Sequence, residues 1–188
     1  MWCQPGNRLR QAHMHTCSLL IRQLYFDQVR EVVSKAQFGD LIEFSYPIGF
    51  SHWGVYDGDG HVIHFAVPDE EPSFWSWIRA KINEAIPVSG DILIGRTQIR
   101  RQRVADVNVP SGAHVMISNH SHAFRPSPVE EMRRRRDALL GREFQYNLIH
   151  LNCEHFATFV RFGKAVCNQF PGRTDVECKE ATEMFRSI

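Results

Sequence analysis

Apolar and polar residues alternate with two different periods near the start of the chain, and each period predicts one type of element. Five apolar residues recur at roughly helical spacing between residues 18 and 35: Leu20, Leu24, Val29, Val32 and Val33. After a Gly-Asp turn at 39–40, the apolar run at 41–44 is typical of a short strand. We therefore expect an irregular segment at 1–17, an amphipathic helix and then a strand.

The strongest local pattern predicts a β-hairpin. Two apolar runs, 52–56 and 61–65, flank a turn with the sequence Asp-Gly-Asp-Gly, in which glycine allows positive φ. Each run carries one of two histidines, His52 and His64. A two-residue loop at 58–59 would direct these side chains to opposite faces, whereas an odd-length loop or a glycine bulge would direct them to one face. Only the second geometry lets the two histidines interact.

Weaker patterns predict the remaining elements. Strands are expected at 92–94, 97–104 and 114–117, and helices at 78–86, 128–140 and from 153 to about 163. Ser127 and Gly141 stand where the caps of the 128–140 helix belong, with Pro128 at its first position. Asn152 is a suitable N-cap for the last helix, which Cys153 would begin. The fold class that we predict is α+β, with a small antiparallel sheet packed against helices.

Composition limits the class of protein. A chain of 188 residues suits a single domain with one site. The formal net charge of +1 argues against nucleic-acid binding, which needs a large basic excess. Five cysteines without a CxxC pair fit a reducing compartment better than a disulfide framework or a zinc ribbon. Since there is no secretory signal pattern and no apolar run of about 18 residues, we expect a cytoplasmic protein whose membrane contact is at most peripheral.

Cys153 is the strongest candidate for chemistry. A thiol at a helix N-terminus lies at the positive end of the helix dipole, which lowers its pKa and makes it a better nucleophile. Backbone N–H groups around Asn152 and Cys153 can also bind an oxyanion. A buried structural cysteine is nevertheless the commoner role for a single cysteine in a helix. The residue alone leaves both interpretations open.

Three segments together resemble the lecithin:retinol acyltransferase-like family, and within it the small phospholipase A and acyltransferase members, also called H-Ras-like suppressors. The segments are Gly-Asp-Leu-Ile-Glu at 39–43, the hairpin from His-Trp-Gly-Val-Tyr to Val-Ile-His-Phe at 52–65, and Asn-Cys-Glu-His-Phe at 152–156. The resemblance spans roughly residues 37–168. It implies an acyltransferase-like catalytic domain over these residues, with a circularly permuted papain-like fold.

The same resemblance implies roles for the candidate residues. Cys153 would be the nucleophile, His52 the general base and His64 the polar group that orients His52. The substrate would be a glycerophospholipid, whose fatty acyl group passes to Cys153 as a thioester. Water, the amine of phosphatidylethanolamine or a lysophospholipid would then accept it. No cofactor and no metal are expected.

The chain departs from the family pattern at both ends. Residues 1–36 form a longer N-terminal extension than the small members carry. Residues 169–188 form a polar tail, which we expect to be poorly ordered, in place of a hydrophobic anchor. Phe38 stands where a proline is usual, and the sequence at 46–51 also differs.

Two rival functions stand beside the lipid acyltransferase. A permuted papain-like peptidase or isopeptidase would use the same cysteine and histidine on an amide bond. A non-enzymatic interaction protein could retain the domain without the chemistry. The presence of Cys153, His52 and His64 together argues against the non-enzymatic alternative.

Four further features favour structural explanations. The run Arg133 to Arg136 is interpreted as a solvated helix face rather than as a contact with anionic lipid headgroups. The aromatic cluster at 74–77 suits core packing at least as well as a membrane interface. His120 and His122 have no partners with the spacing of metal ligands. His155, two positions after the cysteine, points to a different side of the helix and is a poor candidate base.

Overall fold

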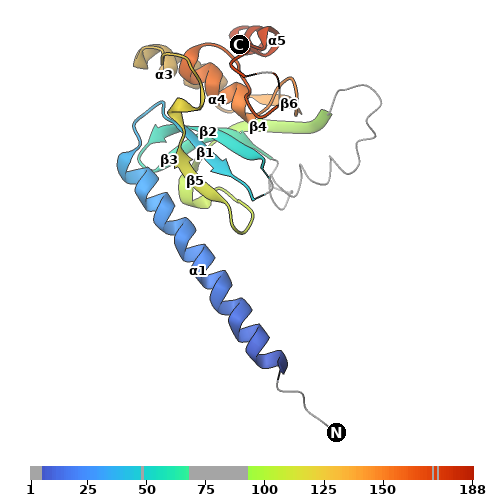
Figure 1. Ribbon diagram of the computed structural model, residues 1–188. Coiled ribbons are helices and arrows are strands. Elements are labelled where there is room, and N and C mark those ends of the chain that lie inside the picture. The colour runs from blue at the N-terminus through green and yellow to red at the C-terminus, as the bar shows by residue number, and fades with distance from the viewer. Residues whose placement is uncertain (1–5, 48, 68–92, 171, 173) are drawn as a thin grey trace.

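A six-stranded antiparallel sheet forms the centre of the molecule (Figure 1). The computed structural model describes residues 6–188 except 48, 68–92, 171 and 173, and for residues 6–18, 93 and 94 it describes the backbone alone. The strands lie in the order β5-β1-β2-β3-β4-β6, so both edge strands come from the second half of the chain. This architecture confirms the predicted α+β class.

The described strands and helices have the following bounds. In chain order the strands are β1 (Leu41–Ser45), β2 (Ser51–Gly58), β3 (His61–Ala66), β4 (Leu93–Arg103), β5 (His114–Ile117) and β6 (Glu143–Asn147). The helices are α1 (Gly6–Lys35), α3 (Val129–Leu139), α4 (Cys153–Phe162) and α5 (Lys179–Arg186), with 3₁₀ helices η1 (Val104–Asp106) and η2 (Asn119–Ser121). Figure 1 shows α3, α4 and α5 on one side of the sheet, whereas α1 leaves the sheet in the opposite direction.

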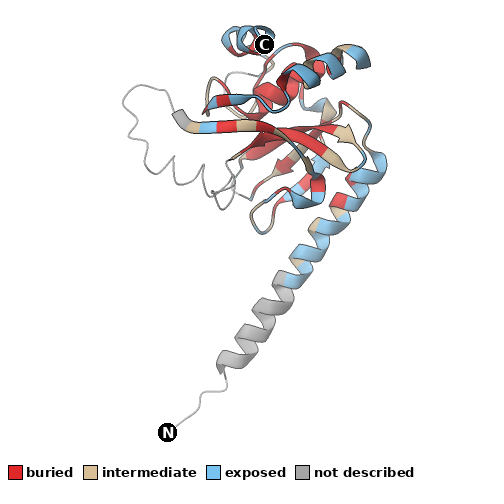
Figure 2. Cartoon of the chain, turned by 180° about the vertical axis from the view of Figure 1, so that it is seen from behind, coloured by how far each residue is buried: buried red, intermediate tan, exposed pale blue. Residues whose placement is uncertain are grey.

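The sheet separates two apolar clusters because side chains alternate between its faces. Along β2, Trp53 and Val55 belong to the cluster that contains α4, whereas Tyr56 belongs to the cluster beside α1. Figure 2 shows that α4 is buried along its length, while most of the described part of α1 is exposed. Buried apolar area contributes about 25 cal/mol per Å². The α4 side therefore contributes more to the stability of the fold than the α1 side.

A β-bulge interrupts the β2–β3 hairpin. Tyr56 pairs with Val62, but Gly58 pairs with His61, so one extra residue stands in β2. All three residues at 58–60 have positive φ. Glycine adopts this conformation without steric cost, which explains its place at the turn. Of the two turn geometries that the sequence allowed, the structure contains the glycine bulge.

The bulge places the two histidines on one face of the hairpin. Gly54 pairs with His64, so His52, two residues away along β2, is a diagonal neighbour of His64. A Cβ atom at Gly54 would lie 2.5 Å from Val62 Cγ2 and 2.9 Å from the carbonyl oxygen of Ile63. Glycine is therefore needed at this position for β3 to approach β2 beside the histidines.

The sheet is more continuous at β4 than the sequence indicated. The two strands predicted around residues 93–103 are one strand, whose register shifts between Leu93 and Gly95. Strand β6, which the sequence analysis missed, alternates exposed and buried side chains, with Phe144 and Tyr146 buried. An alternation over five residues is too short to distinguish a strand from a loop without its partner strand.

The ends of α3 and α4 are capped differently. Helix α4 begins after its N-cap Asn152 and ends at Gly163, where φ is 73°. Helix α3 has Pro128 as its N-cap, without a side-chain hydrogen bond. The hydroxyl of Ser127 instead accepts a hydrogen bond from Arg135 at 2.9 Å. The prediction that Ser127 caps α3 is therefore wrong, because a distant arginine competes for its oxygen.

The C-terminal segment is better ordered than expected. Residues Lys179–Arg186 form α5, in which Phe185 is only 2% exposed. The ring of Phe185 contacts Phe144, Phe156 and Phe159 in the α4 cluster. The expectation of a poorly ordered tail is wrong for this helix, because Ala181, Thr182 and Phe185 are buried against the rest of the fold.

Other sequence predictions fall outside the described residues. The helix expected at 78–86 and the aromatic cluster at 74–77 both lie there. Among the described helices, none combines the length and the apolar character that a membrane span requires.

Candidate active site

Cys153 is the first residue of α4, and a reciprocal cap holds the start of this helix. The side-chain oxygen of Asn152 accepts hydrogen bonds from the backbone N–H groups of Glu154 and His155, at 3.0 and 3.1 Å. In return, Nδ1 of His155 accepts a hydrogen bond from the backbone N–H of Asn152 at 3.2 Å. Such a capping box satisfies N–H groups that a helix start leaves without partners. It fixes the direction in which the helix presents Cys153.

The Cys153 thiol is buried between the start of β2 and the side chain of Tyr146. Its S–H donates to the carbonyl oxygen of Ser51 across 3.9 Å. The Tyr146 hydroxyl donates to Sγ at 3.4 Å, and the hydroxyl oxygen accepts the backbone N–H of Cys153 at 3.3 Å. The backbone amide that the sequence suggested for an oxyanion is therefore bonded to a tyrosine in this structure.

The two histidines of the hairpin form a buried hydrogen-bonded pair. Nε2 of His52 lies 2.8 Å from Nδ1 of His64, and Nε2 of His64 lies 3.0 Å from Oε1 of Gln102 on β4. The Gln102 amide nitrogen donates to the carbonyl oxygen of Asp106 at 3.1 Å, which fixes the orientation of the amide group. Hydrogen bonds therefore connect three side chains in a row across β2, β3 and β4.

This series of hydrogen bonds determines which nitrogen of each neutral imidazole carries the proton. The Gln102 oxygen can only accept, so Nε2 of His64 must be the donor and Nδ1 of His64 must be an acceptor. Nε2 of His52 must then carry the proton that it donates to His64. The lone pair on Nδ1 of His52 is therefore the basic one.

Burial keeps both imidazoles neutral near pH 7. It lowers the pKa of His52 well below its usual value, and the neighbouring His64 lowers it further. Burial also lowers the pKa of His64, to about 4, although the hydrogen bond to Gln102 partly opposes this shift. A neutral His52 can accept a proton.

Burial has the opposite consequence for the thiol. It raises the pKa of Cys153 to about 12, against the lowering effect of hydrogen bonds from Tyr146 and from the backbone N–H of Trp53. The expectation that the helix N-terminus lowers this pKa is wrong for the structure as it stands, because desolvation outweighs the backbone groups. The site at rest therefore holds a neutral thiol beside neutral imidazoles.

A second buried cluster supports the helix start from the other side. The Glu154 carboxylate accepts hydrogen bonds from His122 Nε2 at 2.9 Å, the Cys167 thiol at 2.9 Å and the backbone N–H of Asn168 at 2.8 Å. Burial opposes ionisation, but these bonds together lower the pKa of Glu154. The sequence analysis treated His122 as an ordinary loop residue, whereas it is buried and bonded to the first turn of α4. The described residues contain no group of three or more His, Cys, Asp or Glu side chains able to hold a metal ion.

Two contacts link the residues predicted for the site to the β2–β3 hairpin. Cys153, which follows Asn152, contacts the backbone beside His52, and His52 bonds to His64. The sequence analysis missed Tyr146 and Gln102. The alternation of apolar and polar residues in β6 is a weak indication that Tyr146 is buried. No sequence pattern distinguishes Gln102, because its strand is rich in arginine and glutamine.

The four arginines at 133–136 differ in their exposure to solvent. Its first two residues are exposed, as expected for a solvated face. Arg135 is 16% exposed and donates to the carbonyl oxygen of Val160. Arg136 is 17% exposed and pairs with the buried carboxylate of Asp57. The interpretation as a solvated face is therefore wrong for the last two residues.

The fold and the site together define a class, an α+β domain in which a buried cysteine begins a helix that packs on a hairpin with a hydrogen-bonded histidine pair. The family model described as lecithin retinol acyltransferase matches residues 34–166. The chain belongs to this family. The matched segment contains the entire sheet and α4, which carries Cys153, so the resemblance seen in the sequence is confirmed.

Curated relatives agree with this assignment. Human phospholipase A and acyltransferase 4 is 33% identical over 147 residues, which cover 78% of this chain and 81% of the relative. Human phospholipase A and acyltransferase 1 is 35% identical over 131 residues, 70% of each chain. Human phospholipase A and acyltransferase 3 is 30% identical over 141 residues, 75% of this chain and 80% of the relative.

Proposed function

We propose that this chain is a thiol-dependent phospholipase A and acyltransferase. It takes a fatty acyl group from a glycerophospholipid onto Cys153 and passes it to water, to the amine of phosphatidylethanolamine or to a lysophospholipid. The observation that carries the proposal is the buried thiol held against the backbone beside His52, which is itself bonded to His64. Relatives named for phospholipase A and acyltransferase activity support an acyl ester as the substrate.

Acylation begins with proton transfer from sulfur to nitrogen. Nδ1 of His52 takes the thiol proton as Sγ of Cys153 attacks the ester carbonyl carbon, and the carbonyl π electrons move to oxygen. When the tetrahedral intermediate collapses, the C–O bond breaks and the imidazolium returns the proton to the departing glycerol oxygen. A lysophospholipid leaves, and the acyl group remains on Cys153 as a thioester.

His64 acts on the base rather than on the substrate. Its Nδ1 accepts the hydrogen bond from Nε2 of His52, which holds the tautomer of His52 that carries its lone pair on Nδ1. Gln102 in turn holds His64 in the matching tautomer. The same hydrogen bonds stabilise the imidazolium of His52 when it forms, because the bond that Nε2 donates is then charge-assisted.

The oxyanion is held by the Cys153 amide and the Tyr146 hydroxyl. These two groups bond to each other at rest, so a carbonyl oxygen that enters between them can accept a hydrogen bond from each. Burial, together with the nearby Cys153, raises the pKa of Tyr146 well above its usual value, so the hydroxyl stays a donor. The Asn152 amide is engaged in the capping box, which favours Tyr146 as the second donor.

Deacylation uses the same groups in the reverse order. His52 takes a proton from the attacking water, amine or hydroxyl, a new bond forms to the thioester carbon, and the C–S bond breaks. The proton on His52 returns to the sulfur, which restores the neutral thiol. We propose that contact with lipid is peripheral and that the protein acts on the cytoplasmic side of a membrane.

Intact-mass spectrometry tests the chemistry directly. Purified protein is mixed with phosphatidylcholine vesicles, with or without phosphatidylethanolamine, and both the protein mass and the released fatty acid are followed. We expect one acyl adduct on the wild type and none on Cys153→Ala. Tyr146→Phe should form the adduct about 100-fold more slowly, the usual scale for one lost oxyanion donor.

Cys178→Ala is the matched control, because Cys178 is partly buried and lies outside the proposed machinery. It should form the adduct as the wild type does. Vesicles that contain phosphatidylethanolamine should also yield an N-acylated product. Equal release of fatty acid by wild type and Cys153→Ala, with no adduct on either, would contradict the proposal.

A further inference from the structure

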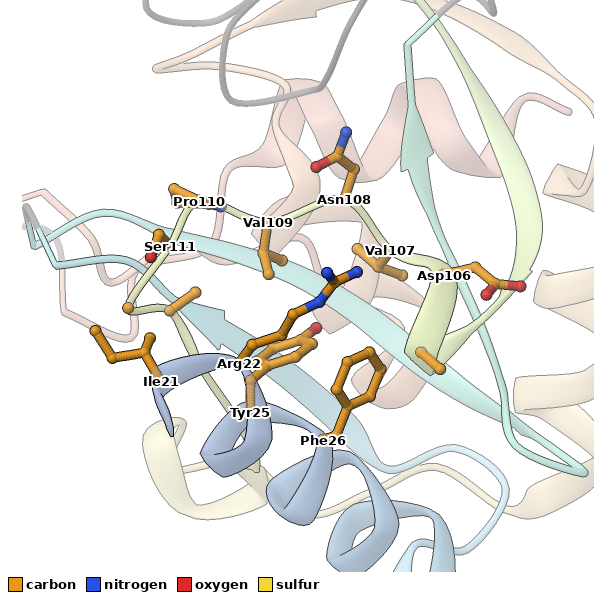
Figure 3. Close-up of a pocket in the computed structure, with 13 residues that line it drawn as sticks. Ile21, Arg22, Tyr25, Phe26, Asp106, Val107, Asn108, Val109, Pro110 and Ser111 are labelled. Atoms are coloured by element: carbon orange, nitrogen blue, oxygen red, sulfur yellow. The ribbon is translucent and has the colours of Figure 1, made fainter. Parts of the chain in front are cut away.

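A cavity of about 490 Å³ lies between α1 and the segment that links η1 to β5 (Figure 3). Binding sites for small molecules usually measure roughly 300–1,000 Å³. Its described lining comes from α1, between Ile21 and Phe26, and from residues 105–113. None of these residues belongs to the candidate active site, so the cavity is a separate feature of the α1 side.

Arg22 extends a cation across this cavity. Figure 3 shows its side chain running from α1 toward Val107 and Val109, beside the ring of Phe26. The guanidinium carbon lies 5.9 Å from the centroid of that ring. The carboxylate of Asp106 also borders the cavity, but Figure 3 shows it directed away from Arg22. An anion beside the guanidinium would therefore not face that carboxylate.

Arg22 differs from Arg30 and Lys35, the other two basic side chains in the described part of α1. Arg30 pairs with Asp27, and Lys35 pairs with Glu31, within the same helix. Arg22 forms no ion pair with any carboxylate in the described part of the chain. A guanidinium without a carboxylate partner, at the edge of a cavity, suits a carboxylate or phosphate that it can bind through two N–H groups.

Tyr25 adds a hydrogen-bond donor beneath Arg22. Its hydroxyl oxygen is buried and has no hydrogen-bond partner among the residues that the structure describes. Burial raises the pKa of Tyr25 to about 12, so the hydroxyl keeps its proton. A buried donor without a partner costs about 1–3 kcal/mol. An acceptor oxygen that reached it would remove this cost.

Apolar side chains line both walls of the cavity, beside the polar residues Asp106, Asn108 and Ser111. Ile21 and Phe26 contribute from α1, and Val107, Val109 and Pro110 contribute from the opposite wall. A small hydrophilic anion would contact Arg22 but would leave these side chains exposed to water. An occupant that matches both parts of the lining has an acidic head and an apolar chain.

We propose that this cavity binds a single-chain anionic amphiphile, with its carboxylate or phosphate on Arg22 and Tyr25 and its chain along Phe26, Val107 and Val109. Fatty acids and lysophosphatidic acids both carry this chemistry. The site does not depend on Cys153, and it gives the N-terminal helix a role in binding.

Calorimetric titration of the Cys153→Ala protein tests the proposal without turnover. The probes are laurate, dodecyl phosphate, acetate and inorganic phosphate, each below any micelle concentration. We expect laurate or dodecyl phosphate to bind at one site per chain, and acetate and phosphate not to bind. The tighter of the two amphiphiles identifies the head group as carboxylate or phosphate.

Three further substitutions in this background locate the site. Arg22→Gln should weaken amphiphile binding at least about 10-fold, because it removes the charge-assisted hydrogen bonds to the head group. Val109→Trp should fill the cavity and abolish binding while thermal unfolding stays cooperative. Arg30→Gln removes the same charge from the exposed part of α1 and should leave the affinity unchanged. Binding that survives both Arg22→Gln and Val109→Trp, or no binding by either amphiphile, would overturn the proposal.

Discussion

The two faces of the sheet treat their buried polar groups differently. On the α4 face, the Glu154 carboxylate accepts hydrogen bonds from His122, Cys167 and the backbone of Asn168. On the α1 face, the Tyr25 hydroxyl is buried without a partner and Arg22 lacks an ion pair among the described residues. A polar group without a partner is costly to bury. The Glu154 carboxylate is therefore satisfied within the chain, whereas the Tyr25 hydroxyl would gain its partner from the proposed ligand.

Burial also determines how strongly charges act in the two regions. Around Cys153, desolvation outweighs every neighbouring donor and keeps both the thiol and His52 neutral. On α1 the ion pairs are exposed, and solvent screens them. Substitutions at the buried site should therefore change chemistry and stability strongly, and substitutions on the exposed part of α1 should change them little.

The largest effect is expected in the pH dependence of alkylation of Cys153. A thiol with a pKa of about 12 has a thiolate fraction that rises about tenfold per pH unit below that value. The rate with iodoacetamide should therefore rise on the order of 1,000-fold between pH 6 and pH 9. Peptide mass mapping measures the rate at Cys153 itself. A rate that levels off below pH 7 would instead indicate a preformed thiolate–imidazolium pair.

The next largest effect is expected for His52→Ala. Loss of a general base costs at least about 100-fold in rate, so acyl-adduct formation on Cys153 should slow by that factor. Stopped-time intact-mass measurements give the rate. His61→Ala is the control, because His61 lies on the same hairpin and its ring bonds only to the Asp59 carbonyl within the described structure. Acylation near the wild-type rate in His52→Ala would assign the base to another group.

A smaller effect is expected on the stability of the fold in acid. The pKa of His64 is about 4 in the folded chain and about 6.5 in an unfolded one, so the unfolded state binds more protons between these values. The contribution of His64 to stability is therefore fully present above pH 6.5 and is lost as the pH falls toward 4. The loss amounts to about 3 kcal/mol.

Urea unfolding at several pH values measures this contribution. The free energy of unfolding of the wild type should fall more steeply between pH 6.5 and pH 4 than that of His64→Gln, which lacks the titrating group. Parallel pH curves for the two proteins would show that His64 is not held neutral by burial.

The smallest effect is expected on α1. Lys35 and Glu31 form an exposed pair one helical turn apart, and solvent screening leaves such a pair little effect on stability. Lys35→Ala should therefore change the free energy of unfolding only slightly and should leave acyl transfer unchanged. Urea unfolding at low and high salt checks both the size and the screening. If the free energy of unfolding fell by several kcal/mol, this exposed pair would matter as much as the buried groups, which would contradict the comparison.

Local sequence patterns predicted much of this fold because their causes are local. The cap at Asn152, the helix that Cys153 begins and the hairpin between the two histidines each depend on residues close together in sequence. Strand β6 and helix α5 were missed, because a short run gains its structure from the partner that it packs against. The Ser127 cap was wrong for the same reason, since Arg135 reaches its oxygen from the next turns of α3.

The sequence by itself determined the candidate nucleophile, the two histidines and the family, because these reside in short runs of residue types. It left open whether the histidines share a face, and the bulge before Gly58 decided that. Only the tertiary structure could bring Tyr146 to the Cys153 thiol, Gln102 to His64 and Arg22 to a cavity. Strand pairing and helix packing join segments that no local pattern connects. Burial, which is a property of the whole fold, then sets the pKa of each group at the site.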